Sequence, residues 1–520
     1  MTAVLDTNNP RNLRWIVLGL FLLAIITRLP FESQYLYHWD SVNMAFGILH
    51  YNVMDGAPQF PGYIVYIVIA QAVNGVLNNP QATMIVISVL STGLAAVAIF
   101  ALARAMFNPI TGIIASLFLI SSPLFWFYGE IALPHTLDLF AVTFSAFLLY
   151  RIMMGHTRWL WWTVVFLGLV GGFRQQDLLF LAPMIIFACY RIGIWRIVGA
   201  LVLGGLVTAA WFIPLMSFSG GIRAYLDGSA AFTASFFTTT SILDGAGEFG
   251  LKRNILNKLI PYTLYAWSVA ALPALYWLPQ IPSHFSQWLR SRKVWFIVLW
   301  IAPALVFYSI IHMGQQGLVF VFFPALVVIS AEGLYRLFQS RPAVLRTATA
   351  LIVLFGAAVF IIAPTYPLGA NSFKLLTSST LREHDQLLEN QVAAVKANFK
   401  PANTLLLAGN WRFFQYYLPD YKFSRFTLGA KFEVDEGEAK GADYVNHPVS
   451  ASDVGLTTKG DWQIAVVDQD LDSFAANPND LKEVSLPNGY TMDYLPMKAN
   501  ELYVTDGKTF TTSEQAASAN

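Results

Sequence analysis

The chain has 520 residues, of which 56% are hydrophobic and 12% are charged. A typical soluble domain has roughly 25% charged residues, so this composition, with a mean hydropathy of +0.53, predicts a membrane protein over most of the length. The net charge of +1 and the lack of a basic stripe give no support to nucleic-acid binding.

Long apolar segments follow one another through the first two thirds of the chain. A helix crosses a bilayer with roughly 20 apolar residues, and the first segment, which follows a short polar N-terminus, has no small-residue cleavage site. We therefore expect it to be a retained helix and not a signal peptide. In all, the sequence predicts eleven spans, near 14–29, 81–106, 109–127, 134–152, 158–173, 177–193, 196–215, 259–280, 294–311, 317–338 and 346–364.

The arginines and lysines predict the orientation. With eleven spans they gather on one side, and short cytoplasmic loops are the ones that collect positive residues. The apolar stretch 61–78 would scatter these charges if it crossed the membrane, so we expect it to lie in the outer interface or to dip in and return. The N-terminus is then cytoplasmic and the C-terminal part extracytoplasmic, in an inner or plasma membrane.

Two domains are predicted. Residues 1–366 form an all-α polytopic membrane domain with outer loops 30–80 and 216–258, and residues 367–520 form a soluble α/β domain. Within this tail, apolar residues recur at helical spacing in 381–398.

Strand and helix patterns then alternate in the tail. The strand-like runs are 404–408 and 463–467, and the last dozen residues are expected to be disordered. Asp468, Gln469 and Asp470 follow the second strand, where they form either a ligand site or a simple turn.

Polar and ionisable residues gather at the outer ends of the predicted spans. Such groups are costly at membrane depth and usually face a cavity or a partner. Their position on one side predicts a single polar chamber that opens outward. Its expected members are Asp40, Glu130, His135, Asp138, Arg174, Gln175, Gln176, Asp177, His312, Gln315 and Gln316.

Asp40 follows the first span, in HWDSVNMA. One interpretation is a helix cap, because Asp favours that position. The other is a general base or a metal ligand, since a carboxylate within hydrogen-bond reach can take the proton of an attacking hydroxyl.

The next outer turn reads YGEIALPHTLD and contains Glu130, His135 and Asp138. A carboxylate–imidazole–carboxylate set can hold a divalent cation such as Mg or Mn, with Asp40, Glu130 and His135 as the candidate ligands. The alternative is a polar turn in which a backbone carbonyl pairs with His135.

Arg174 stands on the side where topology does not favour arginine, in GGFRQQDLLFLAP. Its guanidinium fits phosphate oxygens in a bidentate fork, or it pairs with Asp177 three residues on. In HMGQQ, His312, Gln315 and Gln316 suit a hydroxyl-rich ligand, or form a plain polar loop.

The outer loop 216–258 is rich in Gly, Ser and Thr, so we expect irregular structure or short helices there. Its positive residues Arg223, Lys252 and Arg253 contact either lipid headgroups or a phosphate. Walker and GxGxxG loops are absent from the sequence, so a nucleotide-sugar donor is not expected.

The order of these segments resembles a known superfamily. A first span ends in RLP, then come HWDSVNMAFG and PQFPGYIVY, and YGEIALPHTLD, GGFRQQDLLFLAP and HMGQQGLVFVFFP stand at successive outer turns. Over about residues 10–365 the chain resembles the GT-C superfamily, in particular its protein O-mannosyltransferase-like and aminoarabinose-transferase-like members. The resemblance implies transfer of a sugar from a polyprenyl-phosphate carrier to a protein or glycan acceptor outside the cytoplasm, usually with inversion.

The superfamily commonly has an Asp-Glu pair in its first outer loop, whereas this chain has Asp40-Ser41. Asp40 therefore takes the expected catalytic position, and Glu130 is the best candidate for the second acid. Arg174, with Lys252 or Arg253, is expected to neutralise the phosphate of the lipid carrier. Segments 61–78 and 216–258 are expected to form the lateral opening for its tail.

Two other function classes remain open from the residues. A transporter or flippase for a lipid-linked glycan also needs buried polar groups, but these would be expected to reach both faces. A non-catalytic membrane scaffold would bind glycans or partner subunits through its soluble tail.

Overall fold

The computed structural model describes most of the chain and forms two compact units. One unit comprises Met1–Ser33 and Met44–Leu381, and the other comprises Gln34–Asn43 and Arg382–Asn520. The predicted helical domain and C-terminal sheet are confirmed. The structure describes residues 10–243, 246–364, 367–368, 373–425, 449–450, 461–467, 475, 477–498, 502–505 and 508–511.

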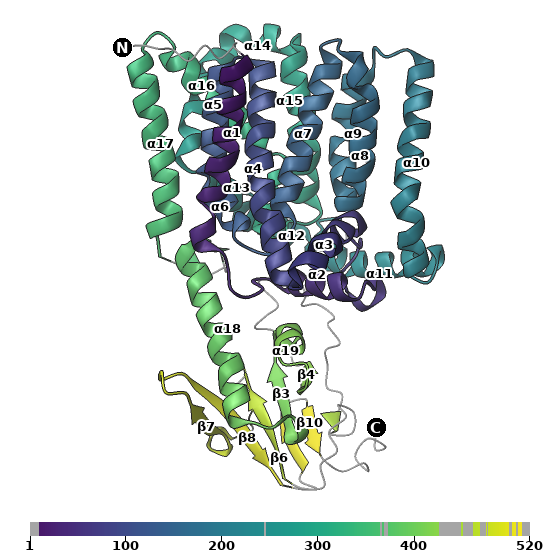
Figure 1. The fold of residues 1–520 in the computed structure, drawn as a ribbon, viewed down its shortest axis with the longest axis vertical. Helices are drawn as coiled ribbons and strands as arrows, with labels where there is room; N and C mark the ends of the chain where they lie inside the picture. The colour runs from purple at the N-terminus through teal and green to yellow at the C-terminus, as the bar shows by residue number, and fades with distance from the viewer. Residues whose placement is uncertain are drawn as a thin grey trace. The chain divides into compact units, whose positions relative to one another are not determined.

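The larger unit is a bundle of helices (Figure 1). Its α-helices are α1 (Pro10–Ile26), α3 (Ile64–Leu77), α4 (Pro80–Met106), α5 (Pro109–Ile120), α6 (Pro123–Gly129), α7 (His135–Met153), α8 (Leu160–Phe173), α9 (Gln175–Cys189), α10 (Ile194–Phe218), α11 (Ile222–Thr240), α12 (Gly247–Leu251), α13 (Ile260–Trp267), α14 (Ile281–Leu289), α15 (Arg292–Ile310), α16 (Phe323–Phe338) and α17 (Pro342–Ile362). Its other helical segments are η1 (Leu29–Phe31), η2 (Val53–Asp55), η3 (Thr157–Trp159), the π-helix η4 (Lys252–Leu259), η5 (Ser268–Gln280) and η6 (Gln316–Val321). A two-stranded pair, β1 (Pro367–Leu368) and β2 (Phe373–Lys374), follows α17.

Among the described residues, seven helical segments are long and apolar enough to cross a membrane, or eight if the bent pair α5 and α6 counts as one span. The eleven predicted spans therefore exceed the helices of full length. Three predicted spans correspond to α8, α9 and α16, which have 14, 15 and 16 residues. The segment predicted to lie in the interface forms α3, which has 14 residues.

Three helices of the bundle begin in the same way. Asn79, Asn108 and Ser122 each accept a hydrogen bond from a backbone N–H in the first turn, and each precedes a proline at the first helical position. Such caps satisfy donors that have no partner inside the helix, and proline lacks the N–H that would be left over. Ser122 lies at the break between α5 and α6, whose axes differ by 65°. Glu130 directly follows α6.

The helix α4 is central to the bundle and packs against α1, α5 and α7. Its core-facing side carries small residues, and a Cβ atom on Gly93 would lie 2.7 Å from the Phe21 ring of α1. Close approach of helices through small residues is the usual way in which membrane helices gain packing contacts. This packing fixes the position of α7, where several of the predicted site residues lie.

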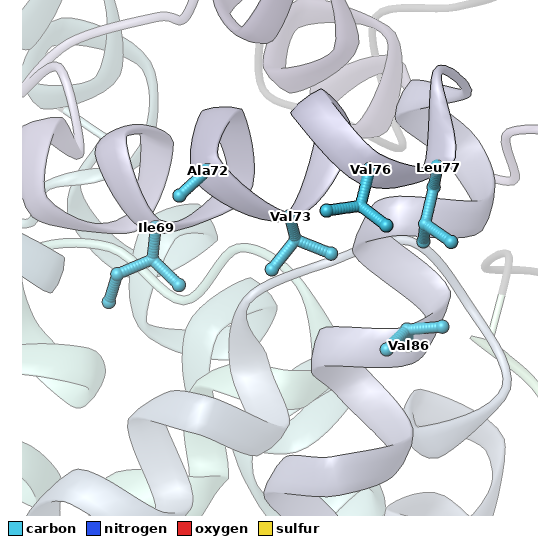
Figure 2. A pocket seen from close by; sticks show the side chains of 6 residues that line it. All are labelled: Ile69, Ala72, Val73, Val76, Leu77 and Val86. Atoms are coloured by element: carbon cyan, nitrogen blue, oxygen red, sulfur yellow. The ribbon is translucent and has the colours of Figure 1, made fainter.

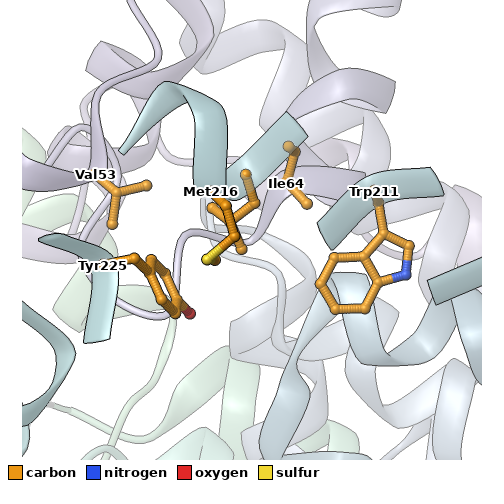
Figure 3. Close-up of a cluster of buried hydrophobic side chains, with 6 residues drawn as sticks. Val53, Ile64, Trp211, Met216 and Tyr225 are labelled. Carbon is orange, nitrogen blue, oxygen red and sulfur yellow. The ribbon is translucent and has the colours of Figure 1, made fainter. Parts of the chain in front are cut away.

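At one end of the bundle, α3 and α11 lie across the ends of the longer helices (Figure 1). A hydrophobic cluster of Val53, Ile64, Trp211, Leu215, Met216 and Tyr225 joins this region (Figure 3). The loop 216–258 was expected to be irregular or to contain only short helices. The structure corrects this, because α11 is a helix of 19 residues that the cluster anchors through Tyr225.

The smaller unit contains α18 (Ser378–Asn398) from Arg382 onward, α19 (Trp411–Tyr417) and a five-stranded sheet of order β4-β3-β6-β8-β7. β3 pairs in parallel with β4 and β6, whereas β8 pairs antiparallel with β6 and β7. The sheet consists of β3 (Thr404–Ala408), β4 (Lys422–Arg425), β6 (Trp462–Val466), β7 (Lys482–Ser485) and β8 (Thr491–Met497). A second sheet pairs β5 (Val449–Ser450), β10 (Lys508–Thr511) and β9 (Leu502–Thr505). Short helical segments η7 (Pro401–Asn403) and η9 (Pro478–Asp480) precede β3 and β7.

The strands predicted at 404–408 and 463–467 correspond to β3 and β6. Part of the end that was expected to be disordered forms β10, and the rest of it lies outside the described residues. Asp468, Gln469 and Asp470 also lie outside the described residues, so their predicted ligand site stays a prediction.

Candidate active site

Several of the predicted site residues meet at one end of the bundle, which we call the polar end. Here α4, α7 and α9 begin, and α8 and α15 end. His135 and Asp138 lie in the first turn of α7, and Arg174 lies directly before α9. All three are largely buried, with side-chain exposures of 6%, 3% and 12%.

Arg174 pairs with Asp138. Its Nη1 lies 3.2 Å from Asp138 Oδ2 and 3.4 Å from His135 Nδ1. The sequence predicted an ion pair with Asp177 as the alternative to phosphate binding. The ion-pair partner is instead Asp138 on α7. Between Arg174 and Asp177 there is a backbone hydrogen bond, from the N–H of Asp177 to the carbonyl of Arg174 at 3.1 Å.

His135 connects this pair to the loop before α16. Its Nε2 lies 2.9 Å from Oε1 of Gln315, so Nε2 carries the proton and donates, and Nδ1 accepts from Arg174. Tyr128 packs edge-on against the imidazole at a centroid distance of 4.9 Å. Three side chains, those of Gln315, Arg174 and Tyr128, therefore contact the ring.

Asp177 is fully buried, and no residue in the described part of the chain donates a hydrogen bond to either of its carboxylate oxygens. Its charged neighbours are Asp138 and Arg174. The hydroxyl of the buried Tyr308 likewise has no partner among the described side chains and backbone groups. A buried carboxylate without a partner is costly, which is typical of a group kept for function.

Glu130 lies apart from this network, beside Arg28 and Trp126. Burial raises the pKa of the Glu130 carboxyl well above its usual range, while Arg28 and Trp126 act in the opposite direction. The Arg28 guanidinium lies over the Trp126 ring at 4.7 Å and donates to the carbonyl of Ile120 at 2.7 Å. Glu130 thus faces a buried arginine, which the sequence analysis did not single out.

His312 and Arg253 belong to a third group. His312 Nδ1 lies 3.0 Å from Oγ1 of Thr240, at the end of α11. Arg253 Nη1 donates to Oδ1 of Asn254 at 3.0 Å and to the carbonyl of Met313 at 3.2 Å. Burial, with Arg253 and Lys258 nearby, lowers the pKa of His312 to about 3. These contacts hold the loop before η6, and Arg253 is one of the residues that bind it. Lys252, by contrast, is exposed.

Asp40 belongs to the smaller unit. It is the second residue of α2 (Trp39–Leu49), and its backbone N–H donates to Nδ1 of His38 at 3.1 Å. His38, and not Asp40, accepts the first hydrogen bonds of the helix through its carbonyl. Asp40 is therefore inside the first turn and is not the cap.

The comparisons with known proteins concern the fold and one segment of the chain. Residues 60–218 match the family model described as dolichyl-phosphate-mannose-protein mannosyltransferase. The fold is similar to that of ArnT from Cupriavidus metallidurans in the apo state, with a TM-score of 0.55 and 12% identity over 93% of this chain and 98% of that chain. ArnT from the same organism bound to undecaprenyl phosphate gives a TM-score of 0.55 at 10% identity, over 94% of this chain and 98% of that chain.

The apo oligosaccharyltransferase of Archaeoglobus fulgidus has a TM-score of 0.51 at 11% identity, over 94% of this chain and 74% of that chain. A search of curated protein sequences finds no match. The chain therefore shares the fold of these proteins, and its residues 60–218 match the mannosyltransferase family model. The predicted resemblance is confirmed at the level of the fold and of the family model.

The predicted metal site is not found among the described residues. Within the described residues, no group of three or more His, Cys, Asp or Glu side chains lies close enough together to hold an ion. The expected carboxylate–imidazole–carboxylate set is not formed, because Glu130 faces Arg28 whereas His135 and Asp138 face Arg174.

Two residues of the helical bundle were missed by sequence reasoning. Arg28 carries a signal, because it stands at the end of the first span that the sequence predicts to be the outer one, where the positive-inside rule does not expect arginine. Tyr308 has no such signal in the sequence, since a tyrosine near the end of an apolar helix is usual in the membrane interface. Only the packing of α15 reveals that its hydroxyl is buried.

Proposed function

We propose that this protein transfers a sugar from a polyprenyl-phosphate-linked donor to a hydroxyl of a protein or glycan acceptor on the extracytoplasmic face of the membrane, with inversion at the sugar carbon. The observation that carries the proposal is the buried Arg174, held by Asp138 and His135 at the polar end of a GT-C bundle. ArnT of the same fold is named as a complex with undecaprenyl phosphate.

Arg174 is the proposed site for the phosphate of the donor. Within the described residues only its Nη1 makes hydrogen bonds, to Asp138 and His135. A guanidinium has five N–H donors, so those on Nε and Nη2 remain for phosphate oxygens. Donors placed where negative charge develops on the leaving group lower the barrier. Lys252, exposed at the start of η4, is proposed to assist, whereas Arg253 is given a positioning role in place of its predicted phosphate contact.

An apolar groove supports the lipid part of the proposal. It has a volume of about 520 Å³ and lies between α3 and the first turns of α4 (Figure 2). The groove is lined by Ile69, Ala72, Val73, Val76, Leu77 and Val86. Such a surface suits an isoprenoid chain, and α3 is proposed to form one side of the lateral opening.

Asp40 is the proposed general base, which takes the proton of the acceptor hydroxyl as its oxygen attacks the sugar carbon. Glu130 is proposed as the second acid, with Arg28 as its buried counterion. Asp177, Gln315, Gln316 and His312 are proposed to shape the sugar and acceptor subsites directly or through the loop before η6. The described residues do not form a cation site, so no step of this mechanism is routed through Mg or Mn.

Replacing Asp40 tests the reaction. The Asp40→Asn variant is expected to lose transfer from a polyprenyl-phosphate sugar by about 10²- to 10⁴-fold, the usual contribution of a general base. The measurement is the rate of product formation with purified full-length protein and a radiolabelled lipid-linked sugar. The matched control is Asp55→Asn, an exposed carboxylate in the same loop, which should keep the wild-type rate.

Transfer at the wild-type rate by Asp40→Asn would overturn the assignment. In the wild-type protein, movement of the labelled lipid between leaflets without sugar transfer would instead support the flippase. Neither sugar transfer nor lipid movement by the wild-type protein would support the scaffold.

A further inference from the structure

The segment that carries Asp40 is built into the C-terminal domain. Residues Gln34–Asn43 form one compact unit with Arg382–Asn520, although they are far apart in the sequence. We propose that α18 and α19 position Asp40 for proton transfer, with Asp385 and Arg412 as the positioning residues. This inference rests on the proposed function, because it gives the soluble domain a part in the same reaction.

The start of the segment is held by backbone hydrogen bonds. Oδ2 of Asp385 accepts from the N–H of Gln34 at 2.7 Å, and Oδ1 accepts from the N–H of Tyr35 at 3.2 Å. The next N–H, of Leu36, donates to the hydroxyl oxygen of Tyr417 at 2.8 Å. Three consecutive backbone donors are thus satisfied by side chains of α18 and α19, and an irregular segment cannot satisfy such donors by itself.

The end of the segment is held by side chains of α19. Nε of Arg412 donates to Oδ1 of Asn43 at 3.0 Å, and its Nη1 donates to Oε1 of Gln415 at 3.0 Å. The ring of Trp39 packs edge-on against Trp411 at a centroid distance of 5.2 Å. Trp411 is in turn stacked on Phe423 of β4 at 5.2 Å, with an angle of 11° between the rings.

Asp40 lies between these two attachments. It is next to Trp39 and three residues before Asn43, in the first turn of α2. A general base works only within hydrogen-bond reach of its proton, and a displacement of about 1 Å can cost about 10²-fold in rate. The attachments on both sides therefore restrict the carboxylate to one place relative to the C-terminal domain.

The first test is a comparison of two variants of α18 in the full-length protein. Asp385→Ala removes both acceptors, and we expect kcat to fall by about 10- to 100-fold, with KM for the lipid-linked donor within twofold. Asp385→Asn keeps one acceptor oxygen, so its kcat should lie between that of Asp385→Ala and that of the wild type. The control is Glu383→Ala, an exposed position two residues earlier, which should keep the wild-type kcat.

The second test measures the position of the segment directly. Hydrogen–deuterium exchange, read by mass spectrometry on peptides that cover 31–46, should accelerate at Gln34, Tyr35 and Leu36 in Asp385→Ala and in no other outer loop. A lower kcat together with this local acceleration supports the proposal. A kcat within twofold of the wild type overturns it, and so does a lower kcat with unchanged exchange.

These outcomes are separate from those of the proposed function. If Asp40→Asn transfers sugar at the wild-type rate, the reaction assignment fails and the positioning role falls with it. If Asp40→Asn is inactive and Asp385→Ala is as active as the wild type, only the positioning role fails.

Discussion

At the scale of single residues, the imidazole of His135 leaves no room for a side chain at position 317, which is a glycine. A Cβ atom at this position would lie 2.7 Å from the Cγ atom of His135 and 2.9 Å from the ring of Tyr128. A Cβ atom this close to another heavy atom forces one of the two to move, and both rings are packed among other side chains. The imidazole of His135, which accepts a hydrogen bond from Arg174, would therefore be displaced.

Gly317→Ala is expected to destabilise the protein by about 1–3 kcal/mol, as overpacking of a close-packed site does, and to reduce sugar transfer by displacing His135. Thermal unfolding in detergent and the transfer rate measure the two effects. Gly205→Ala is the matched control, because nothing lies within 4 Å of its Cβ position on α10, and it should be neutral or stabilising by up to about 1 kcal/mol. An unchanged unfolding temperature in Gly317→Ala would contradict this prediction.

At the scale of elements, α3 presents apolar side chains that the bundle leaves uncovered. Val68 and Val76 are 57% and 80% exposed, and the helix has 14 residues. An apolar helix that lies across the end of a bundle is stable where lipid covers it. This agrees with the predicted interfacial position of the segment and with a role beside the lipid tail of the donor.

Val73→Trp is expected to fill the groove between α3 and α4. If the isoprenoid chain loses about 60 Å² of apolar contact, at about 25 cal/mol per Å² the loss is about 1.5 kcal/mol, or roughly tenfold in KM. The measurement is KM for a long-chain and for a short-chain polyprenyl-phosphate sugar, and only the long-chain value should rise. Val68→Trp is the control on the same helix, outside the lining of the groove. An equal effect on both donors would argue against a lipid in the groove.

At the scale of the whole molecule, the prediction concerns orientation. The distribution of arginines and lysines predicts that the N-terminus lies in the cytoplasm and the C-terminal domain outside. The chain is suited to a labelling test, because Cys189 is its only cysteine. Removing that thiol gives a background in which single cysteines report on the two sides of the membrane.

In a Cys189→Ser background, Asp461→Cys should react with a membrane-impermeant maleimide in intact cells, whereas Arg290→Cys should react only after permeabilisation. Both positions are exposed, so access to the reagent decides the outcome. The opposite pattern would invert the predicted topology, and with it the side of the proposed reaction.

The hydrophobic pattern alone determined the class of the protein, most of its apolar helices and the strands β3 and β6. These are local properties, because burial in lipid or in a sheet selects apolar residues along a single segment. The sequence also predicted Glu130, His135, Asp138 and Arg174 at one end of the bundle, since Glu130 and Arg174 lie between predicted spans and His135 and Asp138 lie at the start of one. The predicted spans that correspond to α8, α9 and α16 form helices of 14, 15 and 16 residues.

Only the tertiary structure decided which of these residues meet. Arg174 pairs with Asp138 on α7 and not with Asp177, and Glu130 faces Arg28. Likewise, the segment of Asp40 is attached to α18 and α19. The physical reason is that a pair between distant segments depends on how helices pack and in which direction their side chains point, which no local pattern of polar and apolar residues specifies.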